Sequence, residues 1–499
     1  MEDFSEYIQS LGFNEYPFST FTTENEKGRE QHLFVHPSNY APIIQNFQQH
    51  QSLILIGNRG TGKTAILSDF KRQIDLRKTL LVEISDFSLL PTSFSQTQFY
   101  NFIIHNISER LIKLLSQEPK RIKKINKDDK ILLSFLIFKF TNNITKNRVK
   151  QRIEEIQSKH LIIRIVRCLY NKLRHLLNFG ASVATNFLDI YIARYLNIPI
   201  DTTTQKIREF FPEIPYTSID MEFNQIPINY EFLCSTFELL HKMQYDNITI
   251  ILDKLDEDSR LKNNGETIAN FARTILTDNR LLLNQDVKIV VSMWSTPFNH
   301  LKEEVRTQKH NCPQLEWLNQ DLKKALNKRL SYYSKERITD YNNLFDSTID
   351  VQQKEMIFEL ANSNPRDLWH IFNELIKTQF HNDSSLFVIE QKTINEALTK
   401  FITEFNYYEY YPRKINARAN TMDVYSYIAL LLRLPNYTFT KNQLNSSAKT
   451  GSSTSNYVIG MERIGLIEKY SQQQGATVYR IRDPKVRYAL RKSLKIEKP

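Results

Sequence analysis

The sequence of residues 57–64 is Gly-Asn-Arg-Gly-Thr-Gly-Lys-Thr, and it directly follows an apolar run at residues 53–56. It fits the pattern G-x-x-x-x-G-K-[ST], which forms a glycine-rich loop between a strand and a helix. The chain has only 11 glycines in 499 residues, and three of them, Gly57, Gly60 and Gly62, lie in this loop. Glycine lets backbone N–H groups turn inward around an anion at little steric cost. The loop therefore predicts a binding site for a nucleoside triphosphate, which we take to be ATP.

The motif assigns roles to its residues. Lys63 is expected to neutralise the β- and γ-phosphates and so to assist catalysis, and the Thr64 hydroxyl is expected to bind Mg²⁺. A strand-to-helix turn that matches the pattern by chance is the alternative, and the flanking strand and helix patterns argue against it. The residues expected to contact the nucleotide are Gly57, Asn58, Arg59, Gly60, Thr61, Gly62, Lys63, Thr64 and Ala65.

A second predicted strand, at residues 247–252, ends in the acidic sequence Asp-Lys-Leu-Asp-Glu-Asp. Asp253, at the carboxyl end of this strand, can hold Mg²⁺ through water beside Thr64. Asp256 or Glu257 is placed to orient and polarise the attacking water, and we favour Glu257. An acidic loop after a core strand is common by itself, so this prediction depends on the glycine-rich loop upstream.

Further candidates are expected on the γ-phosphate side. A polar residue near the end of the predicted strand 287–294 can contact the γ-phosphate, and Ser292 and Ser295 both qualify. Arg306 follows on the next connection and can reach a neighbouring subunit's γ-phosphate as an arginine finger, although a surface arginine is the alternative. Arg366 lies at the start of a predicted helix, where a cation opposes the helix dipole and calls for a compensating anion. The γ-phosphate would supply that anion.

The segment before the loop is placed to pack beside the base of the nucleotide. Phe18, Phe34 and Val35 are candidates for that wall. Packing within the protein core is the alternative for all three, because large apolar side chains are usually buried for that reason.

Composition limits the class of protein. Hydrophobic residues make up 41% of the chain and aromatic residues 12%, which is typical of a folded globular protein. The three cysteines are far apart and match no metal-ligand spacing. No apolar run approaches the roughly 20 residues that a membrane span needs, and the acidic N-terminus does not resemble a secretion signal. We expect a cytoplasmic protein.

The charge of +11 is unevenly distributed. Residues 120–174 contain 16 Lys and Arg against 4 Asp and Glu, and residues 480–498 contain 8 against 2. A basic amphipathic pattern at 161–177 could lie on nucleic acid, on a membrane surface or against other helices. Basic regions on both sides of a nucleotide-binding core suggest contact with a polyanion, with nucleic acid as the leading candidate. Solvated helix surfaces are the alternative.

The last part of the chain predicts helices at 422–434, 441–448 and 452–464, followed by a β-hairpin at 466–481. This order is typical of a winged helix-turn-helix, whose third helix can enter the major groove of DNA. Such domains also serve as packing or protein-contact modules. The residues expected to face DNA are Ser453, Ser455, Asn456 and Arg463, with Arg480 and Arg482 meeting phosphates.

The fold predicted from these patterns is an α/β P-loop NTPase core with a parallel sheet, a large helical insertion, an α-helical lid and a C-terminal winged helix-turn-helix. The predicted boundaries are 1–94 for the N-terminal segment and first part of the core, 95–240 for the basic helical insertion, 241–318 for the second part of the core, 319–415 for the lid and 416–499 for the winged helix.

These motifs together resemble AAA+ and STAND-type P-loop ATPases, and they are similar to the origin-recognition/Cdc6-like branch and to bacterial defence ATPases of the KAP and STAND kind. Asp-Lys-Leu-Asp-Glu at 253–257 resembles the Asp-x-x-Asp-Glu Walker B form of STAND ATPases. Asn-Pro-Arg-Asp-Leu at 364–368 resembles the sensor 2 motif, which implies that Arg366 reports the γ-phosphate to the lid. Residues 318–330 resemble the first lid helix of Cdc6-like proteins, with Arg329 at its characteristic arginine. Two departures are expected from this resemblance, because we recognise neither the long superhelical array of STAND proteins nor the membrane helices of KAP proteins in residues 1–499.

The function expected from the sequence is an ATP-binding and ATP-hydrolysing conformational switch that engages DNA or a partner protein and forms a homo-oligomer. The resemblance suggests a bacterial anti-phage defence system as its setting. A DNA-binding ATPase of the origin-recognition or transcriptional kind is one alternative. A scaffold that activates a separately encoded effector nuclease is another.

Overall fold

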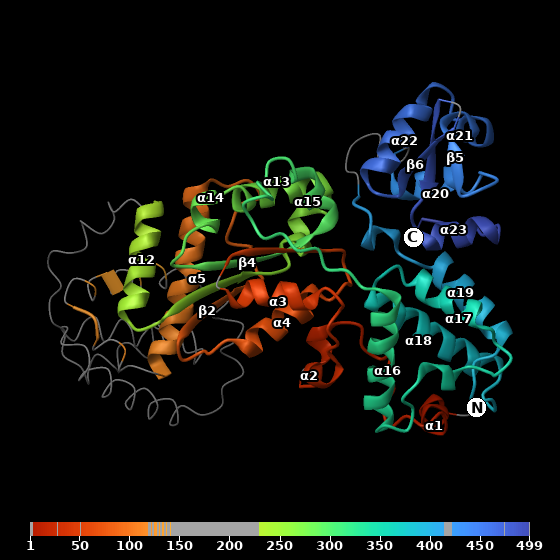
Figure 1. Cartoon of the computed structure of the whole chain (residues 1–499), viewed down its shortest axis with the longest axis horizontal. Coiled ribbons are helices and arrows are strands. Elements are labelled where there is room, and N and C mark those ends of the chain that lie inside the picture. The colour runs from red at the N-terminus through yellow and green to blue at the C-terminus, as the bar shows by residue number, and fades with distance from the viewer. Residues whose placement is uncertain are drawn as a thin grey trace, which may run out of the picture. The chain divides into compact units, whose positions relative to one another are not determined.

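The computed structural model describes residues 3–117, 229–413 and 422–498, except positions 27, 50 and 474, together with nine scattered positions between 121 and 140 (Figure 1). The basic segment at 120–174 and the amphipathic segment at 161–177 lie almost entirely outside these residues. The chain forms two compact units, which are described separately. The first contains Met1–Gln73, Asp253–Ala272 and Val291–Pro499, and the second contains Ile74–Leu252 and Arg273–Val290.

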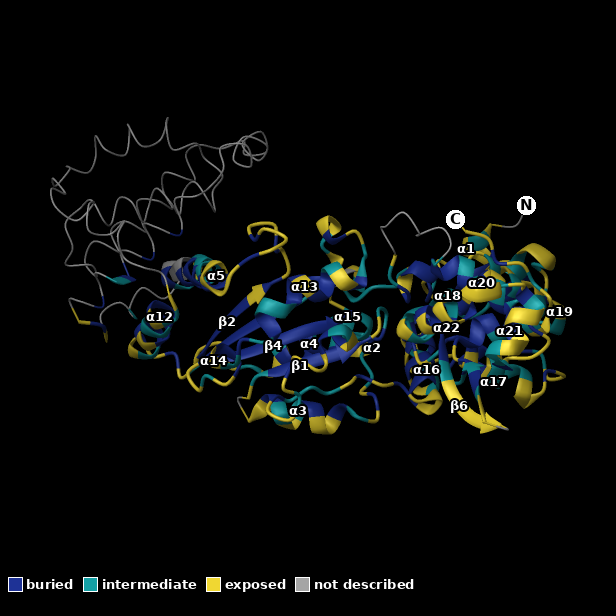
Figure 2. Ribbon diagram, turned by 90° about the horizontal axis from the view of Figure 1, so that it is seen from above, coloured by how far each residue is buried: buried dark blue, intermediate teal, exposed yellow. Residues whose placement is uncertain are grey.

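The central element is a four-stranded sheet with the order β1-β4-β3-β2. Strands β2 and β3 pair in parallel, from Thr79 opposite Asn247 to Ile84 opposite Leu252. The strands are almost wholly buried (Figure 2), as expected for near-continuous apolar runs in a sheet covered on both faces. This confirms the predicted α/β core. The strands are β1 (Leu53–Gly57), β2 (Thr79–Ile84), β3 (Asn247–Leu252) and β4 (Lys288–Trp294).

A short extended segment lies on the other side of β1. Leu53 forms a parallel bridge with Asn311 and Ile56 forms one with Gln314. The backbone N–H of Leu315 donates to the carbonyl of Ile56 at 2.7 Å. Strand β1, which leads into the glycine-rich loop, therefore has paired backbone on both edges.

In the first unit, helices α3 (Tyr40–Gln48) and α4 (Lys63–Gln73) pack together through the stacked rings of Phe47 and Phe70, with centroids 4.3 Å apart. Helix α4 begins directly after Gly62, so its unpaired N–H groups face the glycine-rich loop. The same unit contains α15 (Ser295–Leu301), the 3₁₀ turns η3 (Leu255–Glu257) and η4 (Ser259–Leu261), and most of α13 (Gly265–Leu276).

In the second unit, α5 (Gln96–Gln117) contacts β2 and α12, and α12 (Tyr230–Lys242) also contacts β3. The Arg110 side chain donates to the carbonyl of Leu81 at 3.0 Å. The two described ends of the predicted insertion at 95–240 thus pack on the sheet strands of this unit. Helix α14 (Asn279–Leu282) completes its described part.

The helical part of the first unit shares one hydrophobic core with the N-terminal segment. Phe18 is fully buried there and stacks on Phe372, so its role is core packing rather than a wall for the base. Asn364 caps α18 by accepting a hydrogen bond from the N–H of Arg366, with Pro365 in the first turn. The helices are α1 (Phe4–Ser10), α2 (Glu30–Leu33), α16 (Asn319–Ser334), α17 (Val351–Leu360), α18 (Pro365–Asn382) and α19 (Gln391–Thr403), with 3₁₀ turns η1 (Thr23–Glu26), η5 (Tyr341–Leu344) and η6 (Tyr407–Glu409).

The C-terminal part contains helices and a hairpin close to the predicted positions, and two elements that the sequence analysis did not predict, β5 and α23. Strands β5, β7 and β6 form an antiparallel sheet in that order. Among the described residues of the whole chain, no helix is long and apolar enough to cross a membrane. The elements are α20 (Val424–Leu431), β5 (Thr438–Thr440), α21 (Lys441–Ala448), η7 (Gly451–Ser453), α22 (Thr454–Arg463), β6 (Ile467–Gln473), β7 (Ala476–Ile481) and α23 (Pro484–Arg491).

Candidate nucleotide-binding site

The glycine-rich loop has the backbone geometry that its glycines permit. Gly60 and Gly62 have φ angles of +81° and +83°, which other residues rarely adopt. A Cβ atom on Gly60 would lie 2.5 Å from Oδ1 of Asn364, at the start of α18. Gly60 is therefore required both by its own backbone and by the close approach of the loop to α18.

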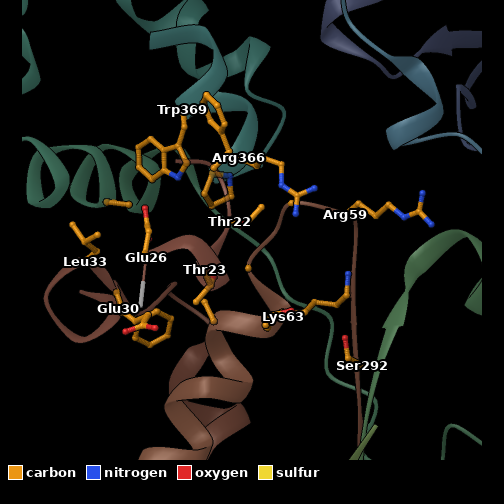
Figure 3. Close-up of a pocket in the computed structure, with 18 of the residues that line it drawn as sticks. Thr22, Thr23, Glu26, Glu30, Leu33, Arg59, Lys63, Ser292, Arg366 and Trp369 are labelled. Carbon is orange, nitrogen blue, oxygen red and sulfur yellow. The ribbon is translucent and has the colours of Figure 1, made fainter. Parts of the chain in front are cut away.

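Two predicted metal ligands meet at the end of this loop. The Thr64 hydroxyl donates to Oδ2 of Asp253 at 2.9 Å, although the two residues are 189 positions apart. Lys63 lies beside them, and its Nζ donates to the carbonyls of Gly57 and Asn58, both at 3.0 Å. Burial lowers the pKa of Lys63, and the nearby carboxylates of Asp256 and Asp253 oppose that shift. The loop and the acidic turn, residues 253–258, thus form one site. Figure 3 shows Lys63 of the loop in this pocket.

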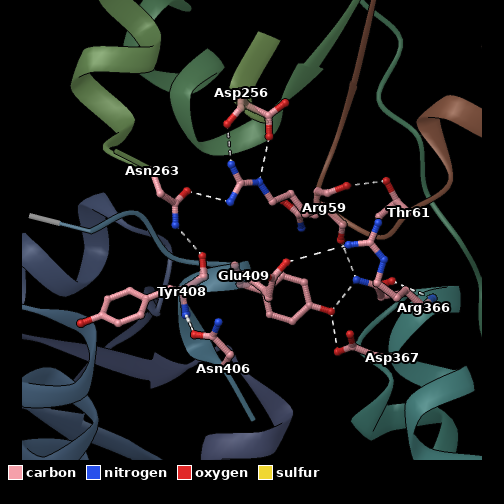
Figure 4. Close-up of polar contacts among 12 residues, drawn as sticks. Arg59, Thr61, Asp256, Asn263, Arg366, Asp367, Asn406, Tyr408 and Glu409 are labelled. Atoms are coloured by element: carbon pink, nitrogen blue, oxygen red, sulfur yellow. Dashed lines mark hydrogen bonds and ion pairs between the residues drawn. The ribbon is translucent and has the colours of Figure 1, made fainter. Parts of the chain in front are cut away.

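The two candidate bases have different surroundings. Asp256 is only 5% exposed, and its Oδ2 forms an ion pair with Nε of Arg59 at 2.8 Å (Figure 4). Glu257 is exposed and lines the same pocket as Lys63. The pKa of Glu257 is raised, first by partial desolvation of its carboxyl group in the pocket and then by the negative charge of Asp256. Glu257 is therefore the carboxyl group better placed to accept a proton from water.

Ser292 and Ser295 differ in whether they reach the pocket. Ser292 lies on β4, is 1% exposed and lines the pocket. Its hydroxyl makes no hydrogen bond with the residues that the structure describes, and in Figure 3 it points toward Lys63. A buried hydroxyl without a protein partner suits contact with a polar ligand. Ser295 does not line this pocket.

The N-terminal segment provides the opposite wall of the pocket. Phe34 and Val35, two of the three residues predicted for the base wall, line it. Two further lining residues were not predicted from the sequence: Trp317, two residues before α16, and Trp369 on α18. Their only sequence signal was aromatic side chains near predicted helix starts, which core packing explains equally well. Other lining residues of this wall are Phe21, Thr22, Thr23, Glu26, Glu30 and Leu33.

Arg329 fixes this wall in place. The side chain is 3% exposed and forms a 2.6 Å ion pair with Glu26. It also donates to the carbonyl of Thr20 at 3.0 Å, and its guanidinium lies 4.8 Å from the ring centroid of Trp369. Arg329 therefore joins the N-terminal segment to α16 and α18 around the pocket.

The two arginines predicted on the γ-phosphate side have different positions. Arg366 lines the pocket, and its guanidinium lies 3.9 Å from the carboxylate of Glu409. Arg306 is exposed in a turn after α15 and does not line the pocket. Its predicted action on a neighbouring subunit stays a prediction.

Neither a protein-family model nor a curated protein matches the sequence. Among solved structures, the chain is similar to the ORC2 protein of Aeropyrum pernix, described as ADPNP–ADP complexes. The TM-score is 0.37 and the identity 9%, over 97% of this chain and 98% of that one.

Proposed function

We propose that this protein is an ATP-binding and ATP-hydrolysing conformational switch of the AAA+/STAND type. The observation that carries the proposal is the 2.9 Å contact between Thr64 and Asp253, next to Lys63 and in a pocket that Glu257 also lines. Residues from two distant segments thus supply a phosphate-binding loop, a pair of oxygen ligands and a carboxyl base. Hydrolysis of a triphosphate requires these three parts together.

The oxygen ligands of Thr64 and Asp253 fit Mg²⁺, which prefers hydroxyl, carboxylate and water oxygens. When bound, Mg²⁺ would neutralise charge on the phosphates. The loop N–H groups and Lys63 would hold the phosphates in place. Glu257 would take a proton from the attacking water as its oxygen bonds to the γ-phosphorus. The bond from phosphorus to the β-γ bridging oxygen would break, leaving ADP and inorganic phosphate.

The same pocket has a place for the adenine base of ATP. Phe34, Trp317 and Trp369 supply aromatic surface on the side of the N-terminal segment. Flat aromatic and apolar surfaces are suited to an adenine ring, and ligand pockets commonly combine them with a few polar groups.

A segment between the lid helices and the C-terminal part contacts the nucleotide site. We call residues 405–413 the connector. Asn364 Nδ2 donates to the carbonyl of Arg59 at 2.7 Å and to the hydroxyl of Tyr410 at 2.6 Å. Glu409, also in the connector, is the group 3.9 Å from Arg366. A γ-phosphate would compete with Glu409 for Arg366, because both are anions that a guanidinium binds.

The connector also holds the C-terminal part. The Tyr408 hydroxyl donates to Asp423 at 2.7 Å, and the Tyr411 hydroxyl donates to Asp483 at 2.9 Å. Movement of Arg366 away from Glu409 would therefore change the restraints on the elements beyond residue 422. We infer that this is how the nucleotide state biases a two-state arrangement of the C-terminal part.

We further propose that α20, α21, α22 and the β6–β7 hairpin form a winged helix that binds DNA. The residues predicted to face DNA, Ser453, Ser455, Asn456 and Arg463, are all exposed. Exposed positions on the third helix are those that a winged helix uses to contact bases. Arg480 is held by Glu468 in an ion pair, so its contact with phosphate would require that pair to open.

Steady-state ATP hydrolysis tests the enzymatic part. Lys63→Ala and Glu257→Gln should each lower kcat by about 100-fold or more, because they remove phosphate neutralisation and the base. Lys71→Ala, on the same helix as Lys63 but outside the pocket, is the control. Thr64→Ala should raise the Mg²⁺ concentration needed for half-maximal rate, and Ser68→Ala on the same helix should not. Wild-type rates in the Lys63 and Glu257 variants would refute the site.

A further inference from the structure

Arg59 lies in the glycine-rich loop, but its side chain forms hydrogen bonds with the acidic turn. Its Nε donates to Oδ2 of Asp256 at 2.8 Å and its Nη2 donates to the backbone carbonyl of the same residue at 2.7 Å (Figure 4). Its Nη1 donates to Oδ1 of Asn263 at 2.7 Å. The guanidinium also lies 4.3 Å from the ring centroid of Trp294, at the end of β4. All three guanidinium nitrogens therefore have a protein partner.

This arrangement argues against direct binding of phosphate by the Arg59 side chain. A guanidinium that reads a phosphate needs donors free to face it, often two at once. Here three of the five N–H donors, one on each nitrogen, face a buried carboxylate, a carbonyl and an amide. The loop binds phosphate through backbone N–H groups, for which the side chain at position 59 is not required.

The ion pair instead fixes the turn that carries the proposed base. Asp256 and Glu257 are consecutive in the 3₁₀ turn η3, so anchoring the Asp256 carboxylate sets where the next side chain projects. The turn begins after Lys254, which has a left-handed φ of 63°. Arg59 connects this turn to the loop that holds the phosphates. Arg59 thus helps to place the base relative to its substrate, together with the hydrogen bond between Thr64 and Asp253.

We propose that Arg59 is a positioning residue for hydrolysis, acting through Asp256 on Glu257. The proposal rests on the proposed function, because it concerns the same reaction. Misplacement of a reacting group by about 1 Å can cost about 100-fold in rate while leaving substrate binding intact. Arg59 is therefore expected to affect kcat much more than KM.

The test compares Arg59→Gln, Arg59→Lys and Asp256→Asn for kcat, KM and ATP affinity, the last measured by equilibrium binding of a fluorescent ATP analogue. Arg59→Gln should lower kcat by about 10- to 100-fold and change KM by less than about threefold. Arg59→Lys should recover part of the loss, because it keeps one charged donor. Combining Arg59→Gln with Asp256→Asn should cost little more than the worse single change, because both remove one contact.

Arg121→Gln is the matched control. Arg121 also lies over an aromatic ring, 4.2 Å from the centroid of Tyr245, and donates to the backbone carbonyl of Gln244. It belongs to the second unit and is not part of the nucleotide pocket. Its replacement should leave kcat and KM unchanged, whatever it does to thermal stability.

Three results separate the outcomes. A wild-type protein without ATPase activity would refute the proposed function itself. An active wild type with Arg59→Gln kcat within twofold would overturn the role of Arg59 alone. So would a raised KM at unchanged kcat, because it would make Arg59 a nucleotide-binding residue. If Arg59→Gln does not fold, the proposal is decided by Arg59→Lys, for which lower kcat at unchanged KM is expected and wild-type kcat would contradict it.

Discussion

The Nζ of Lys485 lies 2.8 Å from Oδ2 of Asp367, and the Lys485 side chain is completely buried. The same Asp367 oxygen accepts a 2.6 Å hydrogen bond from the Tyr410 hydroxyl. The ammonium group also lies 4.5 Å from the ring centroid of Phe405 in the connector. Helix α23, the connector and α18 therefore meet at one buried charge pair. Asp367 of this pair is three residues after Asn364, which contacts the glycine-rich loop through the carbonyl of Arg59.

Breaking this pair should destabilise the first unit strongly. Lys485→Met would leave the Asp367 carboxylate buried without its cation, at a cost of about 3–5 kcal/mol. Lys392→Met, which removes an exposed pair with Glu396, should cost less than about 0.5 kcal/mol. Urea unfolding of both variants measures the difference. Equal stability of the two would mean that Lys485 does not hold α23 against α18.

Gly60 and Gly475 allow the contact between the loop and α18 to be tested separately from backbone strain. Both have positive φ, +81° and +77°, but only at Gly60 would a Cβ collide with Asn364. Alanine should cost about 1–2 kcal/mol at either position through the backbone. Only Gly60→Ala should also lower ATP hydrolysis, by about 100-fold, because the loop must shift. A fall in hydrolysis of the same size in Gly475→Ala would contradict the specific contact.

The pH dependence of hydrolysis should report the raised pKa of Glu257. A base must be ionised, so the rate should fall as the pH drops through a pKa above the usual value for Glu. The cation of Lys254 lowers this pKa, so Lys254→Gln should move the acidic limb of the kcat–pH profile to higher pH. Lys71→Gln serves as control. A limb in Lys254→Gln that stays in place or moves to lower pH would contradict the assignment of the base.

An ion pair between α22 and α13 should compete with DNA for the side chain of Arg463. Nη2 of Arg463 lies 2.8 Å from Oε1 of Glu266, and both side chains are exposed. Glu266→Gln would release Arg463 and should raise duplex affinity by about two- to fivefold, a size set by the small energy of exposed pairs. Fluorescence anisotropy across a salt series measures it, with Glu396→Gln as control. Unchanged affinity in Glu266→Gln and in Arg463→Gln would exclude Arg463 from the DNA contact.

Motifs contained in short segments could be predicted from the sequence. The strand, glycine-rich loop and helix around Lys63 follow from one local pattern. The start of α18 follows from a capping residue and a proline in its first turn. The meeting of Thr64 and Asp253 was expected only because two such motifs imply a common site.

Contacts that join distant segments could not be predicted. Arg59 and Asp256 are 197 residues apart, and Arg59 and Asn364 are 305 apart. Each of these residues has an adequate local explanation, so no periodicity or spacing signals the contact. The connector presents the same difficulty. Its tyrosines donate hydrogen bonds to Asp423, Asp367 and Asp483, and nothing in the local sequence indicates these three partners. Helix α23 was missed because its charged residues resembled a basic tail.

The most direct test is hydrogen exchange of the connector, residues 405–413, in the Glu257→Gln variant with ATP and with ADP. The account predicts different exchange of this segment in the two states, because a γ-phosphate competes with Glu409 for Arg366. Adding Arg366→Ala should remove the difference while ATP still binds. Exchange of residues 405–413 that is the same with ATP, with ADP and without nucleotide would contradict a nucleotide-driven switch.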